Sequence, residues 1–336
     1  MSKLKVAVIG CGNIFPVHAD AIVTNTNVDL IAVVDINKEK ALRAAEKYDC
    51  TFYTDYQQLL DEEDIDVVHI CTPHYQHAPI ALDFLKAGVD VLVEKPLAIN
   101  IEQAEQMIAA AEEYDRRLGV VFQNRFNENI LKAIELLSTG SLGEIKGIKG
   151  LVTWFRDKDY YQQADWRGKF STEGGGVLIN QAIHTLDLMQ LFAGKVTAIQ
   201  GHVDTRRLQS VIEVEDTADA TIFFESGAVG IFFATNCFSS NSPVTIEIDC
   251  EKGSLIIDGG KLLVEADDDF KEYSNSQSSA YKSYWGYGHK ALIDAFYQDI
   301  LEGTDKGIVT AEEGIQTLRM IEAIYRSSNS GNKESL

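Results

Sequence analysis

A lysine stands at the end of an apolar, strand-like run in the first third of the chain, where it could act as a reactive cation. The run covers Val89–Val93 and is followed by Glu94, Lys95 and Pro96. A lysine ammonium can orient and polarise a substrate hydroxyl, and burial or neighbouring charges can tune its pKa. The alternative is an ordinary surface lysine. Pro96 argues against that alternative, because a proline just past a buried strand fixes the path of the chain.

A glycine-rich turn followed by a polar helix face is the second candidate for chemistry. Gly174–Gly176 let the backbone pass close to a neighbour, and a helix is expected over Val177–Phe192. Asn180, His184 and Asp187 then fall at i, i+4 and i+7, on one face of that helix. The alternative is a capped or solvent-facing stripe. His184 suits a general base that removes a hydroxyl proton as hydride leaves the same carbon.

The start of the chain matches part of a dinucleotide-binding fingerprint. A Val- and Ile-rich run over Lys5–Ile9 precedes four residues of the signature, Gly10, Gly12, Asn13 and Ile14. The first glycine permits a sharp turn, and the second lets backbone amides approach a pyrophosphate at a helix N-terminus. Phe15 holds the third glycine position, which predicts looser packing of helix against strand. Two glycines alone are a weak signal.

Asp35 strengthens the dinucleotide interpretation, because it ends the second strand at the distance expected for the acid that binds ribose hydroxyls. Its carboxylate would repel a 2′-phosphate, and the following Ile36 and Asn37 offer no arginine to receive one. NAD is therefore expected rather than NADP. The alternative is that Asp35 only caps a turn before the next helix.

Composition excludes several classes of function. The 336 residues carry a formal net charge of -21, with Lys and Arg scattered along the chain. Nucleic-acid and anionic-membrane binding need a basic surface, so neither is expected. The five cysteines lack metal-ligand or redox spacing and are expected to be reduced. We expect no metal site, no signal peptide and a cytoplasmic protein.

The pattern of apolar runs predicts an α/β protein of two domains. Nearly continuous apolar runs alternate with helical patterns in the first part, which is typical of a doubly wound, parallel Rossmann sheet. Longer alternating runs after residue 124 predict a large, mostly antiparallel open sheet in a second α/β domain. We expect the domains to cover residues 1–123 and 124–336, with the last helices able to pack back on the first.

Local predictions accompany this division. Thr310 and Glu313 fit a capping box at the start of a closing helix over Glu312–Arg326. The stretch Asp267–Ser283 is polar and weakly patterned, so it is expected to be a surface loop. The polar tail after Ser327 is expected to fray.

Taken together, these motifs resemble the glucose–fructose oxidoreductase/inositol dehydrogenase/rhizopine-catabolism (Gfo/Idh/MocA) family over nearly the whole length. The residues that carry the resemblance are Gly10–Ile14, Cys71-Thr72-Pro73 with His77, Glu94-Lys95-Pro96, Gly174–Gly176 with His184 and Asp187, and Gly288-His289. The resemblance implies a Rossmann domain, a C-terminal sheet that commonly forms a homodimer or homotetramer, and oxidation or reduction of a ring hydroxyl of a sugar, sugar nucleotide or cyclitol. It assigns the active-site lysine to Lys95 and the acid/base histidine to His184.

The resemblance also yields expected ligand contacts. For the cofactor these are Gly10, Gly12, Asn13, Ile14, Asp35, Thr72, Pro73, His77, Glu94, Lys95 and Gln123. For the substrate they are Asn180, Trp166, Arg167, Asn124 and Arg156. Inositol dehydrogenase-like members carry aspartate where this chain has Asn180, and an amide cannot raise the basicity of a histidine as a carboxylate can. Inositol itself is therefore less expected.

The branch assigned to sugars and sugar nucleotides, including UDP-N-acetylglucosaminuronate 3-dehydrogenases, is the closer resemblance. Trp166-Arg167-Gly168, Asn180-Gln181 and Glu213–Asp216 carry it. Trp166 could pack near the nicotinamide or the sugar ring, or equally be an interface aromatic. Arg156 or Arg167 could meet an anionic group.

Two other functions stay open from the sequence. One is an NAD-dependent glycosidase that works by transient oxidation and restores NAD. The other is a non-catalytic NAD sensor, because a fold does not guarantee chemistry.

Overall fold

The protein divides into two compact units in the computed structural model, which describes residues 3–266, 269–275, 286, 288–304 and 307–336. The first unit holds Met1–Phe122 and His289–Ile315, and the second holds Gln123–Gly288 and Gln316–Leu336. The helix α11 (His289–Glu302), near the end of the chain, therefore belongs to the first unit.

A six-stranded parallel sheet forms the centre of the first unit in the part of the chain described, in the order β3-β2-β1-β4-β5-β6. Its strands are β1 (Leu4–Ile9), β2 (Val28–Val34), β3 (Thr51–Tyr53), β4 (Val67–Ile70), β5 (Asp90–Glu94) and β6 (Leu118–Val121). The strand order reverses between β1 and β4, which is the point where doubly wound folds bind ligands. The expected Rossmann-type sheet is confirmed.

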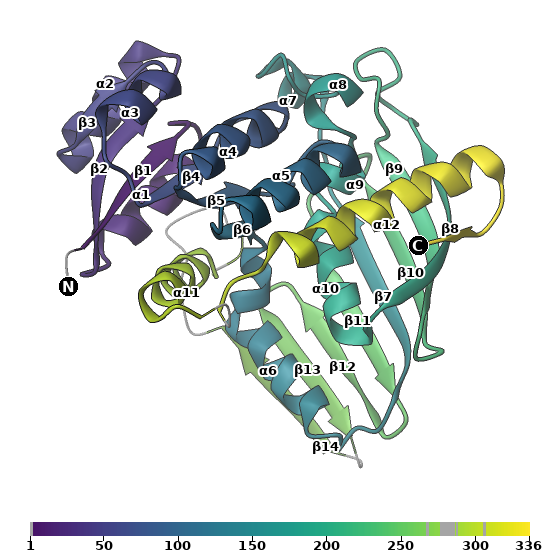
Figure 1. Ribbon diagram of the computed structural model, residues 1–336. Coiled ribbons are helices and arrows are strands. Elements are labelled where there is room, and N and C mark those ends of the chain that lie inside the picture. The colour runs from purple at the N-terminus through teal and green to yellow at the C-terminus, as the bar shows by residue number, and fades with distance from the viewer. Residues whose placement is uncertain (1–2, 267–268, 276–285, 287, 305–306) are drawn as a thin grey trace. The chain divides into compact units, whose positions relative to one another are not determined.

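Helices connect the parallel strands. They are α1 (Phe15–Val23), α2 (Lys38–Tyr48), α3 (Tyr56–Glu62), α4 (His77–Lys86) and α5 (Ile101–Glu113). Figure 1 shows α4 and α5 lying together, and α1 packs against α11. Phe15 is buried, with its ring edge-on to Tyr48 at the end of α2 and a centroid separation of 5.5 Å. The aromatic side chain in the third glycine position therefore fills a contact between two helices.

A nine-stranded, mostly antiparallel sheet forms the second unit, as expected; among its described strands the neighbours β7 and β10 run parallel. The strand order is β14-β13-β12-β11-β7-β10-β9-β8-β15. The strands are β7 (Ile145–Thr153), β8 (Val196–Asp204), β9 (Thr217–Phe224), β10 (Val229–Thr235), β11 (Thr245–Cys250), β12 (Gly253–Asp258), β13 (Lys261–Ala266), β14 (Asp269–Ser274) and β15 (Glu334–Ser335).

Helices cover one face of this sheet. Figure 1 shows α6 (Glu128–Ser138), α10 (Ile183–Ala193) and α12 (Ala311–Ser330) lying across it. The shorter helices of the unit are α7 (Lys158–Gln162), α8 (Phe170–Glu173) and α9 (Val177–Asn180), with a 3-10 helix at Gln123–Phe126. The capping box of α12 is confirmed: Glu313 N donates to Thr310 Oγ1 at 3.3 Å, and Thr310 N donates to Glu313 Oε2 at 3.2 Å.

The prediction of one helix over Val177–Phe192 is wrong, because the structure has α9 and α10 with a break at Gln181 and Ala182. The buried amide of Gln181 donates to the Tyr160 hydroxyl at 3.2 Å and accepts from Asn236 Nδ2 at 2.9 Å. These bonds to distant residues replace the continuation of the helix, which local periodicity could not reveal.

Two further local predictions are wrong. The tail after Ser327 does not fray: α12 continues to Ser330, Ser327 Oγ accepts from Gly201 N at 3.0 Å, and β15 pairs with β8. Within the expected loop Asp267–Ser283, residues 269–274 form β14 on the edge of the sheet. Residues 267, 268 and 276–283 of that expected loop lie outside the described residues.

Candidate active site

The ends of three parallel strands are tied together around Gly10. Gly10 N donates to Val34 O, and Cys71 N donates to Ile9 O, both at 2.7 Å. Gly10 has a φ of +99°, and a Cβ built on it would lie 2.6 Å from the Cys71 carbonyl oxygen. Only glycine combines that dihedral angle with so close an approach of two backbones.

Gly12 serves the turn differently, because a Cβ on Gly12 would meet no atom within 4 Å. The exposed residues Gly12 and Asn13 lead to Ile14, which caps α1 without a side-chain hydrogen bond. The first N–H groups of a helix need partners from outside it, and an anion satisfies them. The open space at Gly12 and the start of α1 fit a pyrophosphate group.

Asp35 follows β2 at the same edge of the sheet. Its two carboxylate oxygens accept from Cys11 N at 2.9 Å and from Asn37 N at 2.8 Å. The turn-capping role that the sequence left open is therefore real. It is compatible with ribose binding, because each carboxylate oxygen has a second lone pair.

The loop after β4 brings Thr72 and Pro73 to this edge, supported from inside by His77. Among the described residues, the buried Oγ1 of Thr72 has no hydrogen-bond partner, so it can serve a ligand. The imidazole of His77 is fully buried, with Nδ1 2.7 Å from Pro96 O and Nε2 3.0 Å from Thr72 O. His77 therefore joins the loops after β4 and β5, and its ring lies behind the surface where the sequence placed a cofactor contact.

Glu94 ends β5, Lys95 follows it directly, and the Lys95–Pro96 peptide bond is cis. Glu94 accepts from Lys95 N at 3.2 Å, and its Oε1 lies 3.0 Å from His18 Nε2. Burial raises the pKa of Glu94, but the hydrogen bond with His18 and the electrostatic influence of His18, His289 and Lys95 outweigh it and bring the pKa to about 2. Glu94 is thus a carboxylate at any working pH, next to the proposed reactive lysine.

His184 begins the candidate site of the second unit. It lies in the first turn of α10, with its Nε2 3.4 Å from Gln123 Nε2. Because an amide NH₂ group only donates, this contact fits a ring nitrogen that carries no proton, the form a general base needs. Gln123, expected at the cofactor, thus lies beside the histidine. Its neighbour Asn124 accepts from Asn127 Nδ2 at 3.4 Å.

Asn180 does not share a face with His184 and Asp187, which both contact the 3-10 helix Gln123–Phe126. Asp187 is 2% exposed and forms a two-pronged ion pair with Arg125, at 2.9 Å from Nε and 2.7 Å from Nη2. This pair ties α10 to the 3-10 helix that carries Gln123. The expected polar face of three residues is wrong, because the helix breaks before α10. Asp187 instead fixes the position of α10, the helix that carries His184.

Asn180 belongs to a different polar cluster, centred on Glu173. Its amide nitrogen donates to Glu173 Oε1 at 2.6 Å, and Gly168 N donates to Glu173 Oε2 at 2.5 Å. Burial raises the pKa of Glu173 to about 7, although both hydrogen bonds lower it. Glu173 was missed from the sequence; an acid directly before three glycines was the available signal.

Two arginines flank the ring of Tyr160, which the sequence also missed. The guanidinium carbon of Arg167 lies 4.3 Å from the Tyr160 ring centroid, and that of Arg156 lies 5.1 Å from it. Arg167 also lies over the Trp166 ring at 5.2 Å. These stacked, partly exposed cations suit an anionic substrate group.

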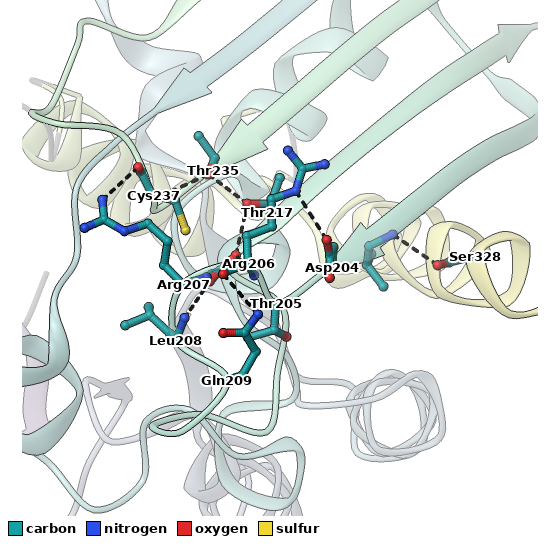
Figure 2. A network of polar contacts seen from close by, with 12 residues as sticks. Asp204, Thr205, Arg206, Arg207, Leu208, Gln209, Thr217, Thr235, Cys237 and Ser328 are labelled. Carbon is teal, nitrogen blue, oxygen red and sulfur yellow. Dashed lines mark hydrogen bonds and ion pairs between the residues drawn. The ribbon is translucent and has the colours of Figure 1, made fainter.

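The loop between β8 and β9 packs against Tyr160 and Tyr161. The buried carboxylate of Asp216 accepts from the backbone N–H groups of Arg206, Arg207 and Leu208 at 2.9–3.1 Å. Figure 2 shows the loop residues Arg206–Gln209 close to Thr217 of β9 and to Cys237, which follows the end of β10. The anchored Leu208 packs in a small core with Tyr161, Ile212 and Val214. The loop thereby fixes the position of the Tyr160–Tyr161 pair.

The glycine turn before α9 is held by Glu215. Its carboxylate accepts from Gly176 N, Leu178 N and the Tyr325 hydroxyl at 2.6–3.1 Å. A Cβ at Gly176 would collide with the carbonyl oxygen of Glu215. The close backbone approach predicted for the glycines is therefore made to Glu215.

Comparison with known proteins identifies the family. A model of the oxidoreductase family's NAD-binding Rossmann fold matches residues 4–122, and a model of its C-terminal α/β domain matches residues 134–336. The chain belongs to the Gfo/Idh/MocA oxidoreductase family. The expected resemblance is confirmed, and the protein is an NAD(P)-dependent dehydrogenase.

Individual relatives are similar over nearly their full length. D-glucoside 3-dehydrogenase of Escherichia coli K12 is 28% identical, covering 100% of this chain and 98% of the relative. Levoglucosan dehydrogenase of Pseudarthrobacter phenanthrenivorans is 28% identical, covering 88% of this chain and 86% of the relative. The WlbA dehydrogenase of Bordetella pertussis, solved with NADH and UDP-GlcNAcA, is 29% identical with a TM-score of 0.86 over 99% of both chains. These relatives favour neither the glycosidase nor the sensor.

The described residues contain no group of three or more His, Cys, Asp or Glu side chains arranged to hold a metal ion. In the same residues, no helix combines the length and apolarity needed to cross a membrane.

Alanine at the two glycines of the turn should separate folding from cofactor binding. We expect Gly10→Ala to lower the thermal unfolding midpoint strongly, because its Cβ collides with the Cys71 carbonyl. Gly12→Ala should keep wild-type stability and weaken NADH binding about tenfold or more, because the methyl group enters the space of the pyrophosphate. Thermal unfolding and NADH fluorescence titration measure both effects. Wild-type NADH affinity in Gly12→Ala would contradict the assignment.

Breaking the Arg125–Asp187 pair should destabilise the protein. Asp187→Asn removes the carboxylate charge that faces the largely buried guanidinium of Arg125, which we expect to lower the free energy of unfolding by about 3–5 kcal/mol. Urea denaturation followed by tryptophan fluorescence measures the loss. The double variant Asp187→Asn/Arg125→Gln is the matched control and should recover part of it; a double variant as unstable as the sum of the singles would argue against the pair.

Proposed function

We propose that this enzyme is an NAD-dependent dehydrogenase that transfers a hydride between the nicotinamide and a ring secondary hydroxyl of a sugar, sugar nucleotide or cyclitol. The observation that carries the proposal is the position of Lys95, which directly follows β5 at the same sheet edge as the Gly10–Gly12 turn. The relatives named for D-glucoside and levoglucosan support the substrate class.

The residues present fit the cofactor. The Gly10–Ile14 turn and the start of α1 would hold the pyrophosphate, Asp35 the adenosine ribose, and Thr72 with Pro73 the neighbouring edge of the ligand. When bound, NAD supplies the acceptor for the hydride. The protein's task is then to orient the hydroxyl and to remove its proton.

Lys95 and His184 share that task in the proposal. The Lys95 ammonium donates hydrogen bonds to the reacting oxygen and stabilises negative charge on it, while the Glu94 carboxylate keeps a fixed counter-charge beside it. His184 accepts the hydroxyl proton on a ring nitrogen. The proposal requires the two side chains to act on one substrate hydroxyl.

A sugar carrying a carboxylate or phosphate is the favoured substrate within this class. Arg156 and Arg167 flank Tyr160 and offer guanidinium groups that match the geometry of planar or tetrahedral anions. A solved relative binds UDP-GlcNAcA, a nucleotide sugar with such groups. Asn180, Trp166 and Asn124 would contact the neutral part of the substrate.

The expected oligomeric state and cellular location both stay predictions. The open sheet of the second unit would form the contacts of a homodimer or homotetramer, and it exposes apolar side chains such as Ile231, at 59%. A cytoplasmic location rests on the sequence alone.

Loss of the Lys95 ammonium should abolish turnover and spare cofactor binding. We expect Lys95→Ala to reduce kcat by about a thousandfold or more, since the charge on the developing alkoxide loses its partner, while NADH affinity changes little. NADH absorbance with UDP-sugars, UDP-sugar acids, free hexoses, anhydrosugars and inositols measures the activity. Wild-type turnover by Lys95→Ala would refute the role of the lysine.

Removal of the charge on Asp35 should relax the choice of cofactor. Asp35→Asn keeps an acceptor oxygen for the turn but no longer repels a 2′-phosphate. We expect the ratio of kcat/KM for NAD to that for NADP to fall about fivefold, because one charge about 4 Å away contributes about 1 kcal/mol in a water-exposed site. Initial rates with both cofactors test this. An unchanged ratio would mean that the capping role is the whole role of Asp35.

A further inference from the structure

A row of four buried polar side chains crosses the interior of the first unit and ends at Glu94. Tyr297 Oη lies 2.7 Å from His69 Nε2, and His69 Nδ1 lies 2.8 Å from His18 Nδ1. His18 Nε2 then lies 3.0 Å from Glu94 Oε1. The four residues come from α11, β4, α1 and β5, so the fold brings together distant parts of the sequence to build the row.

The hydrogen bonds of this row can run in one direction. Tyr297 is 1% exposed, and within the described part of the chain its hydroxyl contacts His69 Nε2. A buried O–H must be donated, so His69 Nε2 accepts and the ring proton of His69 sits on Nδ1. That proton is donated to His18 Nδ1, which places the proton of His18 on Nε2, facing the Glu94 carboxylate.

The charge state of His69 agrees with this direction. Burial is the main cause that keeps the pKa of His69 well below its usual range, so its ring is neutral. A neutral imidazole carries one N–H, so the donor at Nε2 decides what Nδ1 does. Glu94, the acceptor at the end, is ionised, and its other oxygen accepts the Lys95 N–H.

The row does not conduct protons to water. Its far end, Tyr297, lies in the interior, and burial raises the pKa of the phenol well above its usual value, with Asp294 and Cys71 adding to the shift. With no exit at that end, the row acts as a fixed line of dipoles. Polar groups of this kind cost free energy to bury, and apolar side chains would pack as well, so an orienting role explains them better than stability does.

Other charged or titratable groups also face Glu94. His289 Nε2 of α11 lies 4.0 Å from Glu94 Oε1, and burial lowers the pKa of His289 to about 4, so it is neutral near pH 7. Lys95, His77 of α4 and Cys71 after β4 also interact electrostatically with the carboxylate. Of these groups, His18 is the one within hydrogen-bond distance of Oε1.

We propose that Tyr297, His69 and His18 are positioning residues that hold the Glu94 carboxylate in one orientation behind Lys95. This rests on the role of Lys95 in the proposed function. A carboxylate fixed by His18 on one oxygen and by the Lys95 backbone on the other gives the ammonium a counter-charge at a constant place. Loss of the first donor in the row removes the direction of every later bond.

Nitrogen NMR of the full-length protein with ¹⁵N-labelled histidine tests the row without any turnover. The wild-type spectrum should show a neutral His69 protonated on Nδ1 and a His18 protonated on Nε2, with assignments from single His→Gln variants. Tyr297→Phe should change the tautomer of His69. The matched control is Tyr53→Phe, which also removes one hydroxyl bond of a buried tyrosine, made to Glu63 at 2.8 Å on the far edge of the sheet, and it should leave both histidines unchanged.

Steady-state kinetics supply the functional readout. In Tyr297→Phe the Glu94 carboxylate stays ionised but is no longer held in one orientation, so kcat should fall while the KM for the substrate stays at its wild-type value. We expect kcat at pH 7 to fall about fivefold, which is the size of one lost hydrogen bond between neutral groups, with NADH affinity unchanged. Tyr53→Phe should keep the wild-type kinetic profile.

The outcomes separate this proposal from the proposed function. A wild-type His69 protonated on Nε2, or on both nitrogens, would overturn the row whatever the activity, and this result does not depend on the Tyr297 variant. The predicted tautomers together with a Tyr297→Phe profile equal to that of Tyr53→Phe would overturn the positioning role. Full activity in Lys95→Ala would refute the proposed function alone. The histidine tautomers would still show whether the hydrogen bonds of the row run from Tyr297 to Glu94.

Discussion

The close approach of the Gly10 backbone to the Cys71 carbonyl is the contact on which the cofactor half of this enzyme depends. It brings the ends of β1 and β4 together at the point where the strand order reverses. Because parallel strands end at one edge of a sheet, the same arrangement delivers Asp35, Thr72 and Lys95 to that edge. A side chain at Gly10 would separate the two loops and disperse these groups.

In the second unit, buried carboxylates hold the segments around the candidate site in place. Glu215 gathers the N–H groups of the turn before α9, Asp216 gathers those of the β8–β9 loop, and Asp187 fixes α10 through Arg125. Each acid satisfies backbone or guanidinium donors that burial would otherwise leave costly. Several of the chain's many acidic residues therefore have a structural role, because they hold loops in place. The partly exposed arginines near Tyr160 lie close to these loops.

The sequence predicts those features that arise from local periodicity or from short motifs. The strand runs, the Gly10 turn, Asp35 and Lys95 follow from residues next to one another in the chain, and the capping box of α12 was found in the same way. The break at Gln181 could not be predicted, since its causes are hydrogen bonds to Tyr160 and Asn236 from distant parts of the sequence. The paired tail depends on β8 in the same manner. The roles of Glu173, Tyr160 and the His18–His69 row likewise appear only when the tertiary structure places their partners.

The reaction proposed for this enzyme is a direct hydride transfer between a ring carbon and the nicotinamide. It is tested most directly with a UDP-sugar acid deuterated at its ring carbons, incubated with enzyme and NAD in ordinary water, with the reduced cofactor examined by proton NMR. Direct transfer predicts one deuterium at C4 of the nicotinamide, on one face, and none when protiated substrate reacts in heavy water. Deuterium that enters from the solvent instead, or reduced cofactor without deuterium, would contradict it.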